Sequence, residues 1–376
     1  MTLNKTIAFK SLSWLTILYI LILPTLFWLS TKSIIPRVYV EGFSVVIAMT
    51  IVSVYSRAVT LTFLFLTYIF INRLAASHSI PIAFYDFGAV ALLIYYSNFS
   101  IEKFILDKIV IFLVVLEFAF GLYCFYRGWE AEAGRIGGFF HSSMQYSFAT
   151  AGLSIAAYLC FSKWKRMLLL LLLWGSVLLS GSRSAGLCLI IVTFISLADD
   201  LGTFKAVILI LSASCFFMLA SHYFSIRAVS YNAVSDNARM VSYYEWMNRI
   251  SLNDLIYGKG RYYLGSVGRF NNGINAIITE SSVLTFIEAY GLLSAFILLT
   301  APAYKILTSI PKKESIFILI AVYFTALAAP FFETPSLLLV NVILITSSLN
   351  YHLHDKRKAK DNINGAYFVE SKCQKN

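Results

Sequence analysis

Apolar segments of membrane-spanning length recur from Leu12 to Leu349, and this pattern constrains the fold more than any other feature of the chain. A helix needs about 20 apolar residues to cross a bilayer. Charged residues make up only 13% of the 376 residues, whereas they make up about 25% of an ordinary soluble chain. The sequence therefore predicts an all-α, polytopic membrane protein, in which residues 1–376 form a single multi-span domain.

The apolar segments predict about twelve spans, with both chain ends on the inner side of the membrane. The first segment follows Lys5 and Lys10, as a signal peptide would, but it is long for one and no small-x-small cleavage site follows, so we predict a retained span. Residues 351–376 form a predicted inner tail. The predicted spans are 12–30, 38–55, 58–72, 80–97, 104–126, 143–161, 166–181, 185–199, 204–223, 277–299, 315–330 and 336–350.

This topology sorts the basic residues by type. The predicted inner side carries 15 Lys and 3 Arg, and the outer side carries 10 Arg and 2 Lys. Inner basic residues flank apolar segments as topology signals do, so the net charge of +11 does not indicate a nucleic-acid partner. The positive-inside rule does not explain why the outer basic residues are arginines. Arginine captures phosphate or carboxylate through paired hydrogen bonds, which predicts an anionic ligand on the outer face.

Two outer connections are long enough to be functional, and they cover about residues 127–142 and 224–276. The aromatic content of the second argues against disorder. Residues 235–251 predict a helix with Ser235 or Asp236 as its N-cap. On that helix Met240, Tyr244 and Met247 form an apolar strip that could lie on the bilayer or on the helix bundle.

Four outer arginines are the strongest candidates for the anion site. Arg135 precedes the sixth span, and Arg183 lies in a tight turn between two spans, with no acidic residue within a dozen positions. Arg239 and Arg249 are ten residues apart on the predicted loop helix, so they lie about 80° apart around its axis. The alternative for each is snorkelling to lipid headgroups or pairing with a nearby acid. His141 is a candidate for the same site as Arg135.

Acidic residues near the spans offer further candidates. Glu280 and Glu288 are eight residues apart, so they share nearly one helix face. Glu280 at the outer mouth fits either a general base or a structural ion pair with an arginine, and the deeper Glu288 fits a structural role better. Glu117 and Asp86 lie within predicted spans and fit a proton path, a buried pair or an error in the predicted span boundaries.

The remaining acids and histidines do not predict a metal site. Asp199-Asp200 lies on the inner side with no D-x-D partner, so it does not indicate a metal and nucleotide-sugar site. His352 and His354, two residues apart, fit a solvated tail better than a pair of metal ligands.

Residues 134–141 (GRIGGFFH) precede a predicted span, and residues 179–186 (LSGSRSAG) lie at a span junction. With these motifs, the chain between residues 127 and 300 resembles the O-antigen polymerase and ligase superfamily. The resemblance continues in residues 257–260 (YGKG) at the end of the long loop, and in residues 280–284 (ESSVL) followed by 288–292 (EAYGL). The family spacing of Arg, ten residues, then Gly occurs in both outer loops, from Arg127 to Gly138 and from Arg249 to Gly260.

The resemblance implies a GT-C-like glycosyltransferase in the bacterial inner membrane, with its active site facing the periplasm. Its donor would be an undecaprenyl-pyrophosphate-linked oligosaccharide, with no metal or cofactor, and a chain-length-regulating co-polymerase is the expected partner besides membrane lipid. The arginines that would hold the pyrophosphate are Arg183, Arg239 and Arg249, with Arg135 close behind, and Arg127, His141 and Gly260 belong to the same substrate-binding set.

The resemblance leaves the reaction open between two members of the superfamily. A histidine stands near the position of Glu280 in the ligases, so the glutamate favours a repeat-unit polymerase, in which it would orient or deprotonate the acceptor hydroxyl. The alternative is a ligase that transfers finished glycan to lipid A core. An alternative of another class is a lipid-linked oligosaccharide flippase, for which Pro24 and a few acids within spans are the supporting features.

Overall fold

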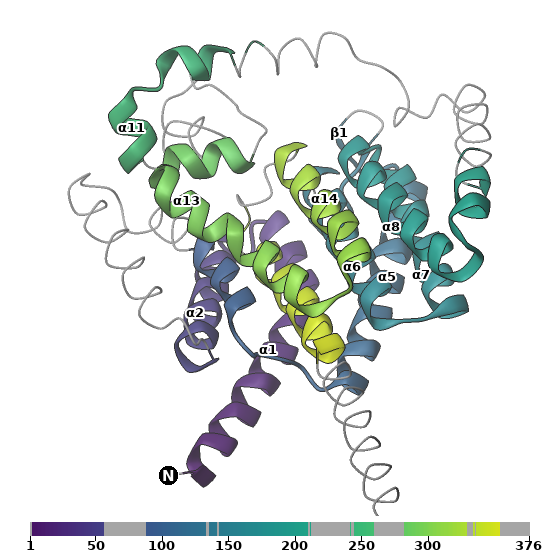
Figure 1. Cartoon of the computed structure of the whole chain (residues 1–376), viewed down its shortest axis with the longest axis horizontal. Helices are drawn as coiled ribbons and strands as arrows, with labels where there is room; N and C mark the ends of the chain where they lie inside the picture. Colours follow the sequence, from purple (N-terminus) through teal and green to yellow (C-terminus); the bar gives the residue numbers. More distant parts are fainter. Residues whose placement is uncertain are drawn as a thin grey trace, which may run out of the picture.

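The computed structural model describes residues 2–55, 88–132, 135–140, 143–209, 211, 241, 244–258, 282–328, 334 and 336–353. Within these ranges the regular structure is helical apart from one short antiparallel ribbon (Figure 1). Its elements are α1 (Thr2–Thr31), α2 (Arg37–Tyr55), the 3-10 helix η1 (Gly88–Tyr96), α5 (Lys103–Tyr126), β1 (Glu130–Glu132), β2 (Arg135–Ile136), the 3-10 helix η2 (Gly138–Phe140), α6 (Ser143–Cys160), α7 (Lys163–Ser180), α8 (Arg183–Leu201), α11 (Leu252–Tyr257), α13 (Ser282–Ser309), α14 (Lys312–Ala328) and a C-terminal helix, Ser336–Leu353.

Four of these helices are long and apolar enough to cross a membrane. They contain the segments Ser11–Ser30, Lys103–Tyr126, Tyr290–Ser309 and Ser336–Leu353. Large apolar side chains such as Trp14, Leu171 and Phe296 are exposed on the helix surfaces, as lipid-facing residues would be. The predicted all-helical class is therefore confirmed for the described residues, and these four helices are compatible with a membrane protein.

The helix bundle has two distinct ends. The ribbon and α11 lie at one end, here called the loop end, which is uppermost in Figure 1, and the N-terminus lies at the other. At this second end, the tail end, Nζ of Lys305 donates to the carbonyl of Ser97 at 3.1 Å. Nε2 of His352 lies 2.8 Å from the carbonyl oxygen of Leu159. His352 is thus half-buried in the C-terminal helix, and its prediction as a solvated tail residue is wrong.

Two segments differ from their predicted form. The described part of predicted span 80–97 is the 3-10 helix η1, whose nine residues rise about 18 Å at about 2.0 Å each. Residues 90–95 are all buried, so this apolar run forms part of the protein core. The first outer loop contains the unpredicted ribbon, in which Glu130 pairs with Ile136 and Glu132 with Arg135.

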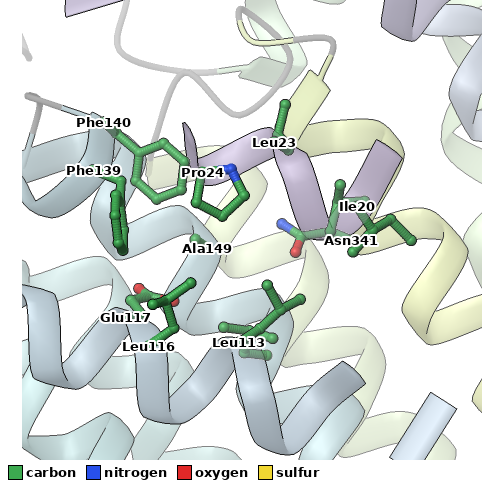
Figure 2. A pocket seen from close by; sticks show the side chains of 12 residues that line it. Ile20, Leu23, Pro24, Leu113, Leu116, Glu117, Phe139, Phe140, Ala149 and Asn341 are labelled. Carbon is green, nitrogen blue, oxygen red and sulfur yellow. The ribbon is translucent and has the colours of Figure 1, made fainter. Parts of the chain in front are cut away.

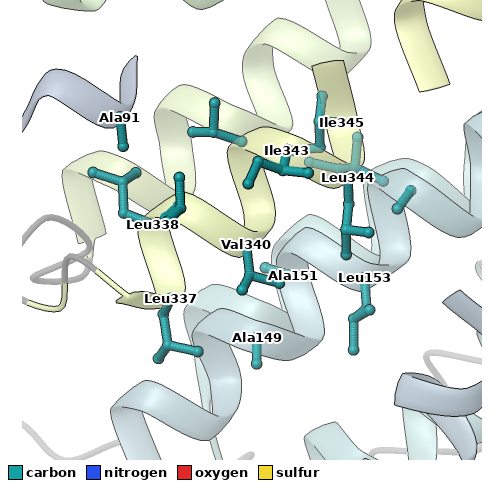
Figure 3. Close-up of a cluster of buried hydrophobic side chains, with 14 of the residues drawn as sticks. Ala91, Ala149, Ala151, Leu153, Leu337, Leu338, Val340, Ile343, Leu344 and Ile345 are labelled. Atoms are coloured by element: carbon teal, nitrogen blue, oxygen red, sulfur yellow. The ribbon is translucent and has the colours of Figure 1, made fainter. Parts of the chain in front are cut away.

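The C-terminal helix forms the centre of the core with α6. Figure 3 shows aliphatic side chains of the C-terminal helix, such as Leu337 and Val340, interleaved with the small residues Ala149 and Ala151 of α6. Close approach is also required at Gly152, because a Cβ there would lie 2.6 Å from Nδ2 of the buried Asn341. Small residues are what permit membrane helices to pack this closely.

Candidate functional site

The loop end carries the described members of the predicted anion site, and a buried tyrosine fixes part of its backbone. Tyr146 of α6 is fully buried, and its hydroxyl donates to the carbonyl oxygen of Glu117 in α5 at 3.1 Å. A Cβ on Gly138 would lie 2.7 Å from the Tyr146 ring, and Gly121 meets the hydroxyl of the same side chain. Gly138 has a φ of +54°, so it turns the chain out of the ribbon where only a glycine fits against the ring. Tyr146 therefore holds the first outer loop against α5.

Arg183 begins α8 at this end. Gly181 closes α7 in the left-handed conformation, with a φ of +61°, and the Ser182 side chain caps α8 by accepting the Ala185 N–H at 3.5 Å. Arg183 is therefore the first residue of a helix whose free N–H groups and positive dipole end favour anions. The sequence predicted a tight turn here, and the backbone confirms it.

Arg127 and Arg135 lie on elements that adjoin this turn. Arg127 caps α5, is exposed, and places its guanidinium carbon 6.0 Å from the centre of the Tyr123 ring. Arg135 lies in β2, which contacts α5, α6 and α7. The backbone positions of Arg127, Arg135 and Arg183 thus belong to one group of contacting elements at the loop end.

A cation and several aromatic rings extend this group, and sequence reasoning missed them. Nζ of Lys32, just after α1, lies 5.2 Å from the centre of the Trp129 ring, and that ring meets Tyr123 edge to face at 5.5 Å. Phe139 stacks on Phe120 at 3.7 Å. Lys32 was one of only two lysines on the predicted outer side, which is the signal that could have found it.

Arg249 lies in a helical segment of the long loop, residues 244–249, which is tied to α13. Nε1 of Trp246 donates to Oε2 of Glu288 at 2.9 Å, and both side chains are buried, with exposed fractions of 8% and 7%. Glu288 thus makes a structural contact, as predicted, and the indole of Trp246 is one of its partners. Tyr244 and Met247 are both 69% exposed, so the predicted apolar strip does not face the bundle at these two positions, and Trp246 does.

The Arg249 side chain is 64% exposed and lies 3.8 Å from the Glu245 carboxylate, one turn earlier. This is the pairing considered as the alternative to a binding role. Exposed i,i+4 pairs contribute only about 0.3–0.5 kcal/mol, so a bound anion could displace the carboxylate at small cost.

Directly after this segment, α11 packs on α13. Ser251 and Asp254 form a reciprocal capping box at its start. The carbonyl of Ile256 packs directly on Gly291, where α13 is kinked at φ +74° and ψ 163°. That conformation is essentially restricted to glycine, so Gly291 provides both the kink and the space for α11.

The arginine-bearing elements fall into two groups in the structure. Figure 1 shows α11, which begins three positions after Arg249, on the other side of the loop end from β1. Glu280, Arg239, His141 and Gly260 lie outside the described residues. Their convergence with Arg127, Arg135, Arg183 and Arg249 around one ligand stays a prediction.

A buried carboxylate lies beneath the first outer loop. Figure 2 shows Glu117 beside a cavity of about 40 Å³ that is lined by Pro24, Phe139, Phe140 and Asn341 among others. Glu117 is 5% exposed and accepts a hydrogen bond from Oγ1 of Thr150 at 2.7 Å. It lies in α5, one of the four described helices that are long and apolar enough to cross a membrane.

At the tail end the Asp199-Asp200 pair has a structural partner. Nη2 of Arg166 lies 3.0 Å from Asp200, and Nη1 lies 3.8 Å from Asp199. The hydroxyl of Tyr158 donates to Asp199 at 2.9 Å, and its ring lies 5.1 Å from the Arg166 guanidinium carbon. These contacts join α6, α7 and α8. Across the described part of the chain, no three His, Cys, Asp or Glu side chains gather as a metal site would require.

Comparison with protein-family models, with curated proteins and with solved structures finds no match to this chain.

Proposed function

We propose that this chain is a repeat-unit polymerase of bacterial surface polysaccharide, with about twelve spans and a GT-C-like fold in the inner membrane. The observation that carries the proposal is the set of arginines at the loop end. Arg127, Arg135 and Arg183 lie on adjoining elements there, and Arg249 is exposed on the loop segment fixed to α13. Guanidinium groups suit the pyrophosphate of a lipid-linked donor.

In the proposed reaction, an acceptor hydroxyl oxygen bonds to the anomeric carbon of an undecaprenyl-pyrophosphate-linked glycan. The bond from that carbon to the pyrophosphate oxygen breaks, and its electron pair leaves with the lipid pyrophosphate. Glu280 receives the hydroxyl proton. Arg183 and Arg249 stabilise the negative charge that develops on the leaving group. The positive end of α8 adds to the field at Arg183.

The other proposed roles concern binding on the periplasmic face. Arg135, Arg239 and Arg127 bind the pyrophosphate and glycan, together with His141 and Gly260. The guanidinium groups supply the positive charge that the reaction requires, so the mechanism uses no metal or cofactor. A chain-length-regulating co-polymerase is the proposed protein partner.

The test is the length of the glycan made in cells. Arg183→Lys and Arg249→Lys should each lose chain extension, because an ammonium cannot reproduce the two-pronged contact of a guanidinium. Gels of the lipopolysaccharide or capsule measure this directly. Arg37→Lys is the matched control, since Arg37 lies on the predicted outer side but pairs with Glu41 at 3.4 Å within α2. Normal long chains from both test variants would contradict the site assignment.

A deletion strain separates the proposed polymerase from a ligase. Loss of a polymerase leaves lipid A core with a single repeat unit. Loss of a ligase leaves bare core, with long chains retained on the carrier lipid.

A transporter of lipid-linked oligosaccharide is the second candidate, and buried Glu117 is the observation that favours it. Ionisable residues within spans commonly mark ion or proton paths. Movement of lipid-linked units across vesicle membranes, with no new glycosidic bond, would support the transporter over the polymerase.

A further inference from the structure

A buried hydrogen bond joins the long loop to the helix bundle at the segment that carries Arg249. The indole N–H of Trp246 reaches the Glu288 carboxylate at 2.9 Å, and both side chains are more than nine-tenths buried. The two residues are 42 positions apart in sequence. Such a bond is costly to break, because the buried indole N–H would lose its acceptor in a low-dielectric site.

The contact fixes a helix surface next to Arg249. Residues 244–249 are helical, and Arg249 follows Trp246 by three positions. Residues three apart on a helix are neighbours, with Cβ atoms about 5–6 Å apart. The ring of Trp246 points into the bundle, while the Arg249 side chain is 64% exposed. The hydrogen bond of the indole therefore fixes the stretch of backbone from which the Arg249 guanidinium extends toward a ligand.

A second contact limits rotation of this segment. Directly after the helical segment, the N–H of Ile250 donates to the Trp246 carbonyl at 3.1 Å, and α11 begins two residues later with its capping box. The Ile256 carbonyl then packs on Gly291, three residues beyond Glu288 in α13. Two attachments about ten residues apart hold the loop segment both in place and in register.

We infer that Trp246 and Glu288 are positioning residues that hold Arg249 over the start of α13 for contact with a pyrophosphate group. This inference rests on the proposed function. It assigns to the two residues a role in anion affinity that a purely structural contact would not have.

The test uses the purified full-length protein with inorganic pyrophosphate as the probe. Hydrogen exchange of residues 244–257 reports docking of the loop, and the pyrophosphate dissociation constant reports the site. Trp246→Phe and Glu288→Leu should each raise exchange about tenfold or more and weaken pyrophosphate binding at least fivefold. Glu288→Gln retains a carbonyl acceptor for the indole, so it should keep the exchange protection. Tyr244→Phe, on the exposed face of the same helix, should change neither quantity.

The outcomes separate the inference from the function on which it rests. Increased exchange without weaker binding would overturn the positioning role, and so would unchanged exchange in Trp246→Phe. Pyrophosphate binding that is insensitive to Arg249→Lys would contradict the proposed function, even where the exchange results agree with a docked loop.

Discussion

Replacement of Gly291 by alanine should release α11 from α13. The observed φ of +74° and ψ of 163° belong to a region that costs a residue with a Cβ about 1–3 kcal/mol. The new Cβ would also lie 2.8 Å from the carbonyl carbon of Ile256 and 2.9 Å from that of Tyr257, and these are backbone atoms that no side-chain rotation can move away. Alanine prefers a helical backbone, so a straighter α13 with α11 undocked would relieve both problems.

The strain alone sets the expected magnitude. Since each 1.4 kcal/mol is a factor of ten, about 1–3 kcal/mol lowers the ratio of docked to undocked α11 by about 5- to 140-fold. Hydrogen exchange of the α11 amides should rise by at least the lower factor in purified protein. Exchange of α11 that matches the wild type would refute the reasoning, because α11 would then not depend on the kink.

Gly186→Ala is the matched control. Gly186 lies within α8, and its Cβ would come no closer than 3.6 Å to Val177. Alanine there should stabilise the helix by about 0.5–1 kcal/mol and leave the exchange of α11 unchanged.

Two further predictions concern packing away from the loop end. Arg166→Met should lower the free energy of unfolding by about 2 kcal/mol, less than for a fully buried pair because the Asp199 and Asp200 side chains are 38% and 24% exposed. Thermal unfolding in detergent measures this, and a second substitution, Asp200→Asn, should then cost less than it does alone; strict additivity would argue against the pairing. Gly152→Ala should cost about 1–3 kcal/mol through overpacking against Asn341. Adding Asn341→Ala should recover part of that loss, and no recovery would show that the clash lies elsewhere.

Hydropathy predicted the bounds of individual helices, because a segment must be apolar along its own length to lie in lipid. Predicted span 104–126 corresponds to α5 at Lys103–Tyr126, and span 143–161 corresponds to α6 at Ser143–Cys160. Lipid and protein core are both apolar, however, so composition could not show that η1 in predicted span 80–97 is a 3-10 helix. The kink at Gly291 also escaped prediction, because the need for glycine there comes from a carbonyl 35 positions earlier in the chain.

Around the candidate residues, the local backbone was predictable from the sequence but the long-range contacts were not. The Gly181 and Ser182 turn before Arg183 is a local signal, and the structure has it. The Trp246–Glu288 bond joins residues far apart in sequence, and the only local hint was a carboxylate in an apolar segment that required a buried partner. Tyr244 and Met247 of the predicted strip are exposed, and sequence periodicity alone could not decide whether this face of the loop helix meets the bilayer or the bundle.

Reconstitution tests the central claim most directly. Purified protein in vesicles is supplied with undecaprenyl-pyrophosphate-linked repeat units, without nucleotide or ion gradient. The proposed polymerase should make chains of two or more units and release one lipid pyrophosphate for each new linkage, and Arg183→Lys and Arg249→Lys should abolish both products. Repeat units that remain single, with folded protein and a suitable lipid-linked acceptor present, would contradict the account.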